Sequence, residues 1–213
     1  EYTERHIAVL PTRAHFATRV RALLDHERMG LPERENGVYA YTWNPGQAEQ
    51  DVLRITRDLA EPGTVLIDPA SFNADGTVSL GDFRLSPDGS LVAYGLSDGG
   101  SDWNSWHFRQ TSDGQELPDT LRYSKFFPVA WAHDGKGVYY SRYPERDGRG
   151  DDAGRPDGYF HQLGTPQSAD ALVYRVTDHA TRVPSAEVTR DGRYLIISLF
   201  DGYQQNGVDL LDL

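Results

Sequence analysis

One pentapeptide of this 213-residue chain matches the pattern around the nucleophilic serine of many hydrolases, namely Gly95-Leu96-Ser97-Asp98-Gly99. In those enzymes the GxSxG serine sits on a sharp turn between a strand and a helix, which exposes its hydroxyl and supplies an oxyanion site. A strand is predicted before Ser97, over residues 91–94, but Gly99-Gly100-Ser101 is a poor start for a helix. Trp106 and Phe108 then alternate as they would in a strand. We therefore predict that Ser97 is a turn residue at the end of a strand and not a nucleophile.

The histidine and cysteine content gives no recognisable metal site. The seven histidines lie at positions 6, 15, 26, 107, 133, 161 and 179, and no pair has the HExxH or a similar ligand spacing. The chain has no cysteine, which excludes disulfides and thiolate ligands. We therefore expect no metal and no cofactor.

Two short segments combine charged and aromatic side chains in a way that suits ligand binding. The first is Gly100-Ser101-Asp102-Trp103, and the second is Lys125-Phe126-Phe127, which leads into Val129-Ala130-Trp131. Alternation along an extended chain places Phe127, Val129 and Trp131 on one face and leaves Lys125 at the mouth of the strand. Both segments also have an ordinary interpretation, as a turn and as sheet packing. The residues alone leave open whether Asp102 and Lys125 face a ligand.

A strand–turn–strand sequence repeat occurs three times, and we expect its strands to position these two segments. The copies span residues 85–94, 131–140 and 188–197, and their Asp-Gly pairs start at Asp88, Asp134 and Asp191, 46 and 57 residues apart. Asp-Gly favours tight primed turns, because both residues tolerate a positive φ. Hairpin repeats of roughly 40–50 residues are typical of β-propeller blades. The sequence therefore predicts a mainly β fold that is a partial β-propeller.

Residues 1–30 differ from the rest of the chain. Apolar residues recur there every three or four positions, which predicts a helix over residues 12–26 with Thr12 as its N-cap. From Gly37 onward apolar residues recur at every second position, as they do in strands. Strands are expected within residues 38–43, 52–56, 64–68, 77–110, 126–143, 158–176 and 188–200, with a polar loop over residues 145–158.

These patterns divide the chain into two parts. The first is an N-terminal helical segment, residues 1–30, and the second is a propeller region, residues 37–213. The propeller region holds about three and a half blades, whereas four to eight blades close a propeller.

The charge and apolar content limit the partners of the chain. Its 21 basic and 32 acidic residues give a net charge of −11, which argues against nucleic-acid binding. No apolar run approaches the length that crosses a bilayer, so no membrane partner is expected. The lack of cysteine fits a reducing compartment, and we expect a cytoplasmic protein, with a periplasmic location left open. Because the chain starts without Met and ends within a predicted strand, we interpret it as a fragment of a longer protein.

Several motifs occur in the order that one protein family shows. They are Gly30-Leu31-Pro32, Gly95-Leu96-Ser97, Gly100-Ser101-Asp102-Trp103, Lys125-Phe126, Ala130-Trp131, His133-Asp134-Gly135-Lys136-Gly137, Ser141-Arg142-Tyr143-Pro144, the octapeptide at 161–168, Ala186-Glu187 and Asp191-Gly192-Arg193-Tyr194. With these motifs the chain resembles the prolyl oligopeptidase (prolyl endopeptidase) family of serine peptidases. The resemblance implies a seven-bladed β-propeller that caps an α/β-hydrolase domain, on which the N-terminal helical segment packs. It also implies that the catalytic triad belongs to that C-terminal domain, so that this chain alone holds no catalytic residue and is inactive.

The resemblance assigns roles to three residues of this chain. Asp102 matches a propeller carboxylate that interacts with a substrate-binding arginine of the hydrolase domain. Phe126 matches an aromatic residue that lines the pocket for the side chain two positions before the scissile proline, and Lys125 matches a charged neighbour at the same mouth. Departures from the family pattern at Glu33, Val183 and Tyr203 bear on the fine specificity of the subsites.

Two functions fit these observations. The first is the gating and pocket-lining part of a serine oligopeptidase that hydrolyses short proline-containing peptides after proline, by acylation of a serine with histidine as general base. The alternative is a non-catalytic propeller that binds peptides or proteins. A hydrolase domain encoded after Leu213 would favour the first.

Overall fold

The computed structural model describes the chain except for residues 1, 74, 146–153, 178–180 and 204. In the described residues, two helices precede sixteen strands that form four antiparallel sheets. His179 and most of the polar loop expected over residues 145–158 lie outside the described residues. None of the described helices is long and apolar enough to cross a membrane.

The sheets follow one another along the chain. The helices are α1 (Tyr2–Ala8) and α2 (Arg13–Leu24). Sheet 1 contains β1 (Arg28–Met29), β2 (Glu33–Glu35), β3 (Val38–Asn44), β4 (Val52–Thr56) and β5 (Thr64–Ile67). Sheet 2 contains β6 (Val78–Leu85), β7 (Leu91–Asp98), β8 (Trp103–Gln110) and β9 (Glu116–Lys125). Sheet 3 contains β10 (Ala130–Trp131), β11 (Gly137–Arg142), β12 (Asp157–Gln162) and β13 (Ala171–Tyr174). Sheet 4 contains β14 (Val183–Val188), β15 (Tyr194–Asp201) and β16 (Gln205–Asp212), and two short 3-10 turns lie at Pro69–Ser71 and Gln167–Ala169.

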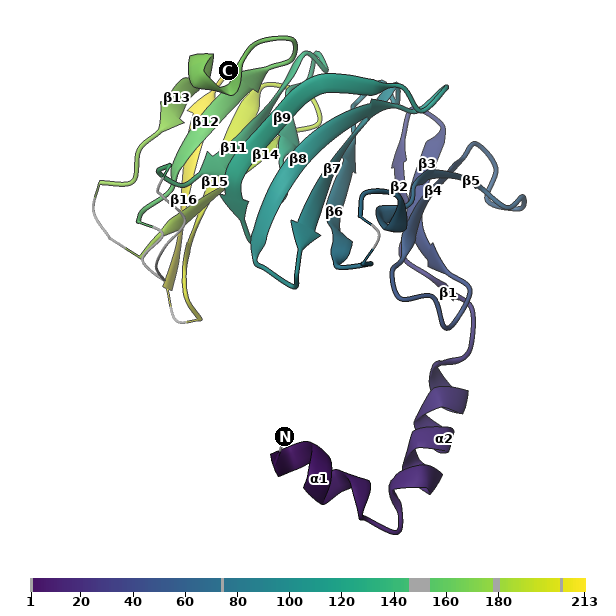
Figure 1. Ribbon diagram of the computed structural model, residues 1–213. Coiled ribbons are helices and arrows are strands. Elements are labelled where there is room, and N and C mark those ends of the chain that lie inside the picture. Colours follow the sequence, from purple (N-terminus) through teal and green to yellow (C-terminus); the bar gives the residue numbers. More distant parts are fainter. Residues whose placement is uncertain (1, 74, 146–153, 178–180, 204) are drawn as a thin grey trace.

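The four sheets lie face to face in chain order, as the blades of a propeller do (Figure 1). The expected strands of sheets 1 to 3 are present, but β9 lies outside the expected ranges, and residues 126–129 connect β9 to β10 without being part of a strand. Sheet 4 is more complete than expected, because β14 starts before residue 188 and β16 follows β15. The prediction of a partial β-propeller with an N-terminal helix is confirmed.

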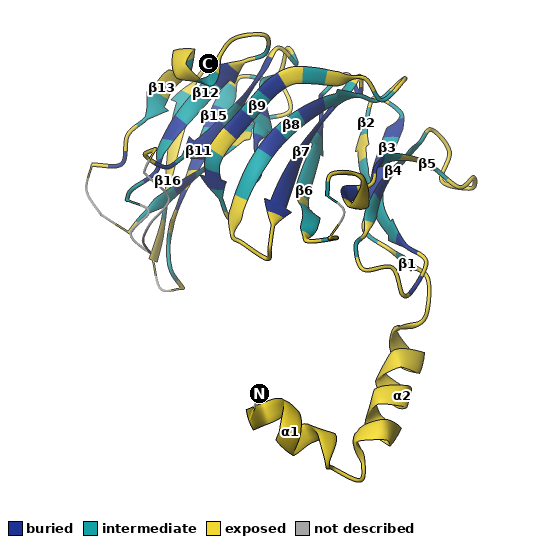
Figure 2. Cartoon of the chain, in the orientation of Figure 1, coloured by how far each residue is buried: buried dark blue, intermediate teal, exposed yellow. Residues whose placement is uncertain are grey.

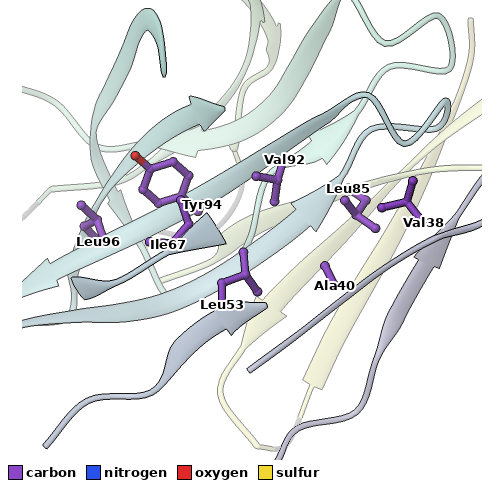
Figure 3. Close-up of a cluster of buried hydrophobic side chains, with 8 residues drawn as sticks. All are labelled: Val38, Ala40, Leu53, Ile67, Leu85, Val92, Tyr94 and Leu96. Carbon is purple, nitrogen blue, oxygen red and sulfur yellow. The ribbon is translucent and has the colours of Figure 1, made fainter. Parts of the chain in front are cut away.

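The core lies between neighbouring sheets. Strand β7 shows why, since it is buried on both faces: Val92 and Tyr94 pack with Leu53 and Ile67 of sheet 1 (Figure 3), whereas Ala93 packs with residues of sheet 3. Alternate side chains of a strand point to opposite faces, so each middle strand is apolar at every position when both faces are covered. Similar clusters join sheet 2 to sheet 3 around Trp106, Phe108, Leu121, Val129, Trp131, Val138 and Tyr140, and sheet 3 to sheet 4 around Val176, Leu195, Ile197 and Leu199.

The three Asp-Gly turns share one geometry, which differs from the expected primed turn. In each turn the glycine N–H donates to the carbonyl three residues earlier and the glycine φ is positive, while the described aspartates keep a negative φ. Each aspartate carboxylate accepts a hydrogen bond from the N–H two residues later, at 3.0 Å for Asp88 and Asp134 and 3.1 Å for Asp191. Five residues separate the two strands of each hairpin, which is long enough for an unprimed turn. The aspartate carboxylate stabilises that turn through its hydrogen bond to the backbone. The prediction of primed turns at these positions is therefore wrong.

A primed turn does occur at a fourth hairpin, which the sequence analysis missed. Asn36 and Gly37 connect β2 to β3 with φ of 44° and 76°, as a two-residue primed turn requires. Strand β2 belongs to sheet 1, in addition to the three strands expected within residues 38–43, 52–56 and 64–68. The Asn36 side chain also donates to the backbone carbonyl of Asp88, at 3.0 Å, and so joins the turn of sheet 1 to that of sheet 2.

Helices α1 and α2 project away from the sheets, and all their described residues are exposed (Figures 1 and 2). Arg28 and Met29, which the prediction assigned to the helical segment, form β1 of sheet 1. Helix α2 is slightly shorter than predicted, and α1 precedes Pro11. Thr12 is the N-cap residue, as predicted, although its side chain makes no capping hydrogen bond. The apolar side chains of Phe16, Val20 and Leu24 remain more than half exposed.

Candidate functional site

The three residues singled out by the resemblance lie together at one end of sheet 2. Strand β8 begins at Trp103 and β9 ends at Lys125, and these two residues are paired in the sheet. Asp102 directly precedes Trp103, and Phe126 directly follows Lys125. The pairing of β8 with β9 therefore brings the two candidate segments to the same place, at the opposite end of the sheet from the Asp88 turn.

Lys125 is surrounded by aromatic rings. Its Nζ lies 4.3 Å from the centroid of the Trp103 ring and 5.4 Å from the centroids of both Phe126 and Tyr143. We call these three rings the aromatic cage. Cation–π contacts at such distances each contribute about 0.5–2 kcal/mol, more as water is excluded. The cage therefore holds the ammonium group in one place.

The backbone at Phe126 has an unusual conformation. Its φ is 68°, in the left-handed region that bulky residues rarely adopt. The N–H of Phe127 donates to the carbonyl of Lys125 at 2.9 Å, which closes a three-residue turn around Phe126. The turn directs the Phe126 ring outward, and the residue is 58% exposed. A strained backbone that presents an aromatic ring to solvent is a feature of binding sites, because the packing of a core gains nothing from it.

Tyr143 anchors the cage from sheet 3. It follows β11 directly, is only 5% exposed, and its backbone N–H donates to the carbonyl of Tyr123 at 2.8 Å. Burial raises the pKa of its hydroxyl to about 12, so the side chain stays neutral. Sequence reasoning gave Tyr143 no role, although it stands in one of the motifs that carried the resemblance, because only the fold brings it to Trp103.

Asp102 lies at the turn between β7 and β8, and it is exposed. Its side chain forms no ion pair with a cation that the structure describes, and the nearby Asn104 amide donates only to its backbone carbonyl, at 3.4 Å. The carboxylate is therefore available at the site end of sheet 2. Asp102, Lys125 and Phe126 are brought together as neighbours.

An apolar and aromatic border extends from the cage to sheet 4. Phe127 packs edge to face on Phe200 of β15, with the ring centroids 6.0 Å apart, and Phe200 contacts Tyr203 in the same way at 6.5 Å. Val183 is the pairing partner of Phe200 in β14. Two of the three positions that depart from the family pattern, Val183 and Tyr203, thus belong to the same border.

The third such position, Glu33, lies elsewhere. Its carboxylate accepts a hydrogen bond from the N–H of Leu85 at 2.7 Å, at the end of β6 that is remote from Asp102. Burial raises the pKa of the Glu33 carboxyl, partly offset by this hydrogen bond and by Arg84. Glu33 therefore joins two inner strands and does not contribute to the cage.

Ser97 lies within strand β7, where it pairs with Ser79 of β6. It lies near the end of β7, and β8 follows after a short turn where a catalytic serine would need a helix. The residue is only 7% exposed, and its hydroxyl donates to the backbone carbonyl of Ser101. The prediction that Ser97 is a turn residue is wrong, because β7 extends through Asp98 before the turn begins. Among the described residues, no group of three or more histidine and acidic side chains is arranged to hold a metal ion.

A buried polar cluster joins sheets 2 and 3 away from the cage. His161 lies between two buried carboxylates, with Nε2 3.1 Å from Asp119 Oδ1 and Nδ1 2.7 Å from Asp170 Oδ1. Asp170 also accepts a hydrogen bond from Tyr140, at 2.6 Å. Burial alone would lower the pKa of His161, but the two carboxylates outweigh it and raise the pKa. The three side chains of His161, Asp119 and Asp170 are at most 2% exposed, so we interpret the cluster as a bridge between sheets.

A hollow of about 790 Å³ lies where the first strands of the sheets face each other. It is lined by residues of β6, β10 and β14 and by the turn after β2, including the charged side chains of Glu35, Arg84, Glu187 and Arg190. First strands that surround a common axis are the inner strands of a propeller.

Comparison with known proteins gives a consistent result over the whole chain. The family model "Prolyl oligopeptidase, N-terminal beta-propeller domain" matches residues 1–213. A prolyl endopeptidase of Elizabethkingia meningoseptica is 32% identical over 216 residues, which cover 100% of this chain and 30% of that protein. Prolyl oligopeptidase A of Amanita bisporigera is 31% identical over 242 residues, covering 100% of this chain and 32% of that protein.

Solved structures agree with this assignment. A structure from a study of two prolyl endopeptidases superimposes with a TM-score of 0.79 and 34% identity, over 100% of this chain and 30% of the other. Prolyl oligopeptidase B from Galerina marginata, bound to a 25mer macrocyclization substrate, superimposes with a TM-score of 0.87 and 27% identity, over 99% of this chain and 32% of the other. The chain thus spans about a third of the length of these relatives. It belongs to the prolyl oligopeptidase family, of which it represents the N-terminal β-propeller region.

Proposed function

We propose that this chain is the gating and pocket-lining part of a serine oligopeptidase that hydrolyses short peptides after proline. The observation that carries the proposal is the meeting of Asp102, Lys125 and Phe126 at one end of sheet 2, in a chain that matches the family over its full length. In this proposal Phe126 contacts the substrate side chain two positions before the scissile proline. Asp102 interacts with a substrate-binding arginine of the catalytic domain.

The partner of this end of the propeller is a C-terminal α/β-hydrolase domain of the same protein. The helical segment supports this part of the proposal, because α2 presents Phe16, Val20 and Leu24 to solvent with nothing in the described chain to cover them. Exposed apolar residues on one helix are typical of a surface that packs on another domain. The helices also project from the side of the sheets on which the cage lies (Figure 1).

The propeller would then wall off the active site. Its inner strands line a hollow with both acidic and basic side chains. In this proposal the closed propeller would admit extended peptides but no folded protein. We propose seven blades for the complete propeller and a cytoplasmic location for the protein. Cell fractionation tests the location.

The experiment that tests the function uses the full-length protein that carries this chain. We expect it to cleave a fluorogenic peptide after proline, to leave the same sequence within a folded protein uncut, and to react with a fluorophosphonate probe at a serine outside residues 1–213. Ser97→Ala should leave both the activity and the labelling unchanged. Binding of proline peptides without labelling or cleavage would instead identify a non-catalytic peptide-binding propeller.

A further inference from the structure

We propose that Lys125 is a specificity-determining residue, which allows the pocket lined by Phe126 to accept an acidic side chain. The inference rests on the proposed function, since it takes Phe126 as a contact of the residue two positions before proline. The methylene groups of a glutamate at that position would pack on the Phe126 ring. Its carboxylate would then reach the ammonium group of Lys125, which lies 5.4 Å from the centroid of that ring.

The first observation behind this proposal is that Lys125 has no acidic partner. Its Nζ contacts three aromatic rings, and it forms no ion pair with any carboxylate that the structure describes. Two other cations of these sheets do have such a partner: Arg109, at the other end of β8, lies 2.7 Å from Glu116, and Arg142, beside Tyr143, lies 3.7 Å from Asp170. Other described cations, such as Arg54 over the Trp43 ring, also form no ion pair with a described carboxylate, so Lys125 is distinguished by its contacts with three aromatic rings.

The second observation is the surroundings of the ammonium group. The Tyr143 ring is buried, and it closes the cage on the side of sheet 3, whereas Trp103 and Phe126 are 38% and 58% exposed. The cage is therefore closed on one side and open on the other. The rings displace water from Lys125, and a charge pair gains strength as the local dielectric constant falls.

A purely structural role for Lys125 explains these contacts less well. The edge-to-face pair of Trp103 and Tyr143 does not need a charge beside it, and an apolar side chain would fill the same space without the cost of removing an ammonium group from water. The nearby Asp102 forms no ion pair with Lys125, so it does not neutralise the charge. The cation is thus held in position and left available to a ligand.

The test compares four peptides that differ only at the position two residues before proline, which is Glu, Gln, Leu or Lys. With the full-length protein we expect the Glu peptide to exceed the Gln peptide in kcat/KM by about 3- to 10-fold, as for a half-exposed charge pair. The ratio of kcat/KM for the Glu peptide to that for the Gln peptide should fall toward one as the salt concentration rises from 50 mM to 500 mM. Lys125→Met should reduce the ratio of kcat/KM between the Glu and Gln peptides to about one, and Lys125→Arg should retain the ratio.

Charge reversal and a binding measurement complete the test. Lys125→Glu should favour the Lys peptide over the Glu peptide. Dissociation constants of the same peptides, measured with the reactive serine replaced, should follow the same order, and they remain informative even for a protein that has no peptidase activity. A Glu preference that survives in Lys125→Met, or an equal loss for all four peptides in both Lys125→Met and Lys125→Gln, would overturn the proposal.

Discussion

The rings of Trp103 and Tyr143 meet edge to face, with their centroids 5.3 Å apart and their planes at 80°, although they belong to different sheets. Trp103 opens β8 in sheet 2, and Tyr143 follows β11 in sheet 3. The contact therefore joins two blades at the point where Lys125 and Phe126 lie. Because such aromatic pairs are worth about 0.5–1.5 kcal/mol beyond the area that they bury, the junction also fixes the geometry of the site.

Removing the Tyr143 ring should destabilise the protein and loosen the cage. Tyr143→Ala would leave a cavity beside Trp103 and should lower the free energy of unfolding by about 3 kcal/mol. Thermal unfolding of the full-length protein measures this loss, and the fluorescence of Trp103 should shift to the red as water enters. Tyr143→Phe keeps the ring, so it should remain close to the wild type. A loss of similar size in Tyr143→Phe would show that the hydroxyl, and not the ring, stabilises the junction.

Two of the turn glycines form a matched pair. Gly135 and Gly192 have φ of 69° and 74°, so alanine at either position costs about 1–2 kcal/mol of backbone strain. A Cβ at Gly192 would lie 2.6 Å from the Cβ of His133 in the neighbouring turn, whereas a Cβ at Gly135 has nothing within 4 Å. Gly192→Ala should therefore lower the melting temperature more than Gly135→Ala. An equal decrease in melting temperature for both variants would mean that the turn holding Gly192 moves away from His133 without an energetic cost.

The His161 bridge should make stability depend on pH. Its two carboxylates raise the pKa of His161 in the folded state above the unfolded value of about 6.5. The stabilisation is therefore complete below about pH 6.5 and is lost as the pH rises through the folded-state pKa. The difference in melting temperature between wild type and His161→Gln should shrink over that interval.

Asp119→Asn serves as the control for the bridge. It removes one of the two carboxylates that raise the pKa of His161, so the stabilisation should be lost at a lower pH than in the wild type. A difference between wild type and His161→Gln that grows as the pH rises would contradict this account.

The repeat made the fold predictable, but one hairpin escaped notice for a physical reason. Strand β2 is Glu33-Arg34-Glu35, with no apolar residue, so it gives no alternating pattern. It forms because β3 pairs with it and because Glu33 accepts a hydrogen bond from Leu85. Its turn is Asn36-Gly37, which is not one of the three Asp-Gly repeats.

The site was predictable only in part. Phe126 and Asp102 were identified through motifs, and the pairing of Trp103 with Lys125 explains why they meet. The aromatic cage could not be predicted, because Tyr143 reaches it across a blade interface that no local pattern encodes. The positive φ of Phe126 also has no signal in the sequence, since glycine is the usual residue there.

Replacing Phe126 in the full-length protein should reduce peptide cleavage without destabilising the fold. The side chain is 58% exposed, so Phe126→Ala should change the melting temperature little. A contact of this size with a substrate should be worth about 1–3 kcal/mol, which corresponds to a loss of about 5- to 150-fold in kcat/KM for peptides with a bulky residue two positions before proline. Peptides with glycine at that position should lose little, because they never fill the pocket.

Trp131→Ala provides the contrast to this prediction. Trp131 is 7% exposed and donates from its indole N–H to the carbonyl of Arg84 at 2.9 Å, so its removal should cost about 3–5 kcal/mol of stability. The two variants thus separate a residue that contacts substrate from one that packs between sheets. If Phe126→Ala lowered the melting temperature as Trp131→Ala does, or reduced the cleavage of bulky and glycine peptides equally, Phe126 would be a packing residue. Its left-handed backbone would then have no part in binding.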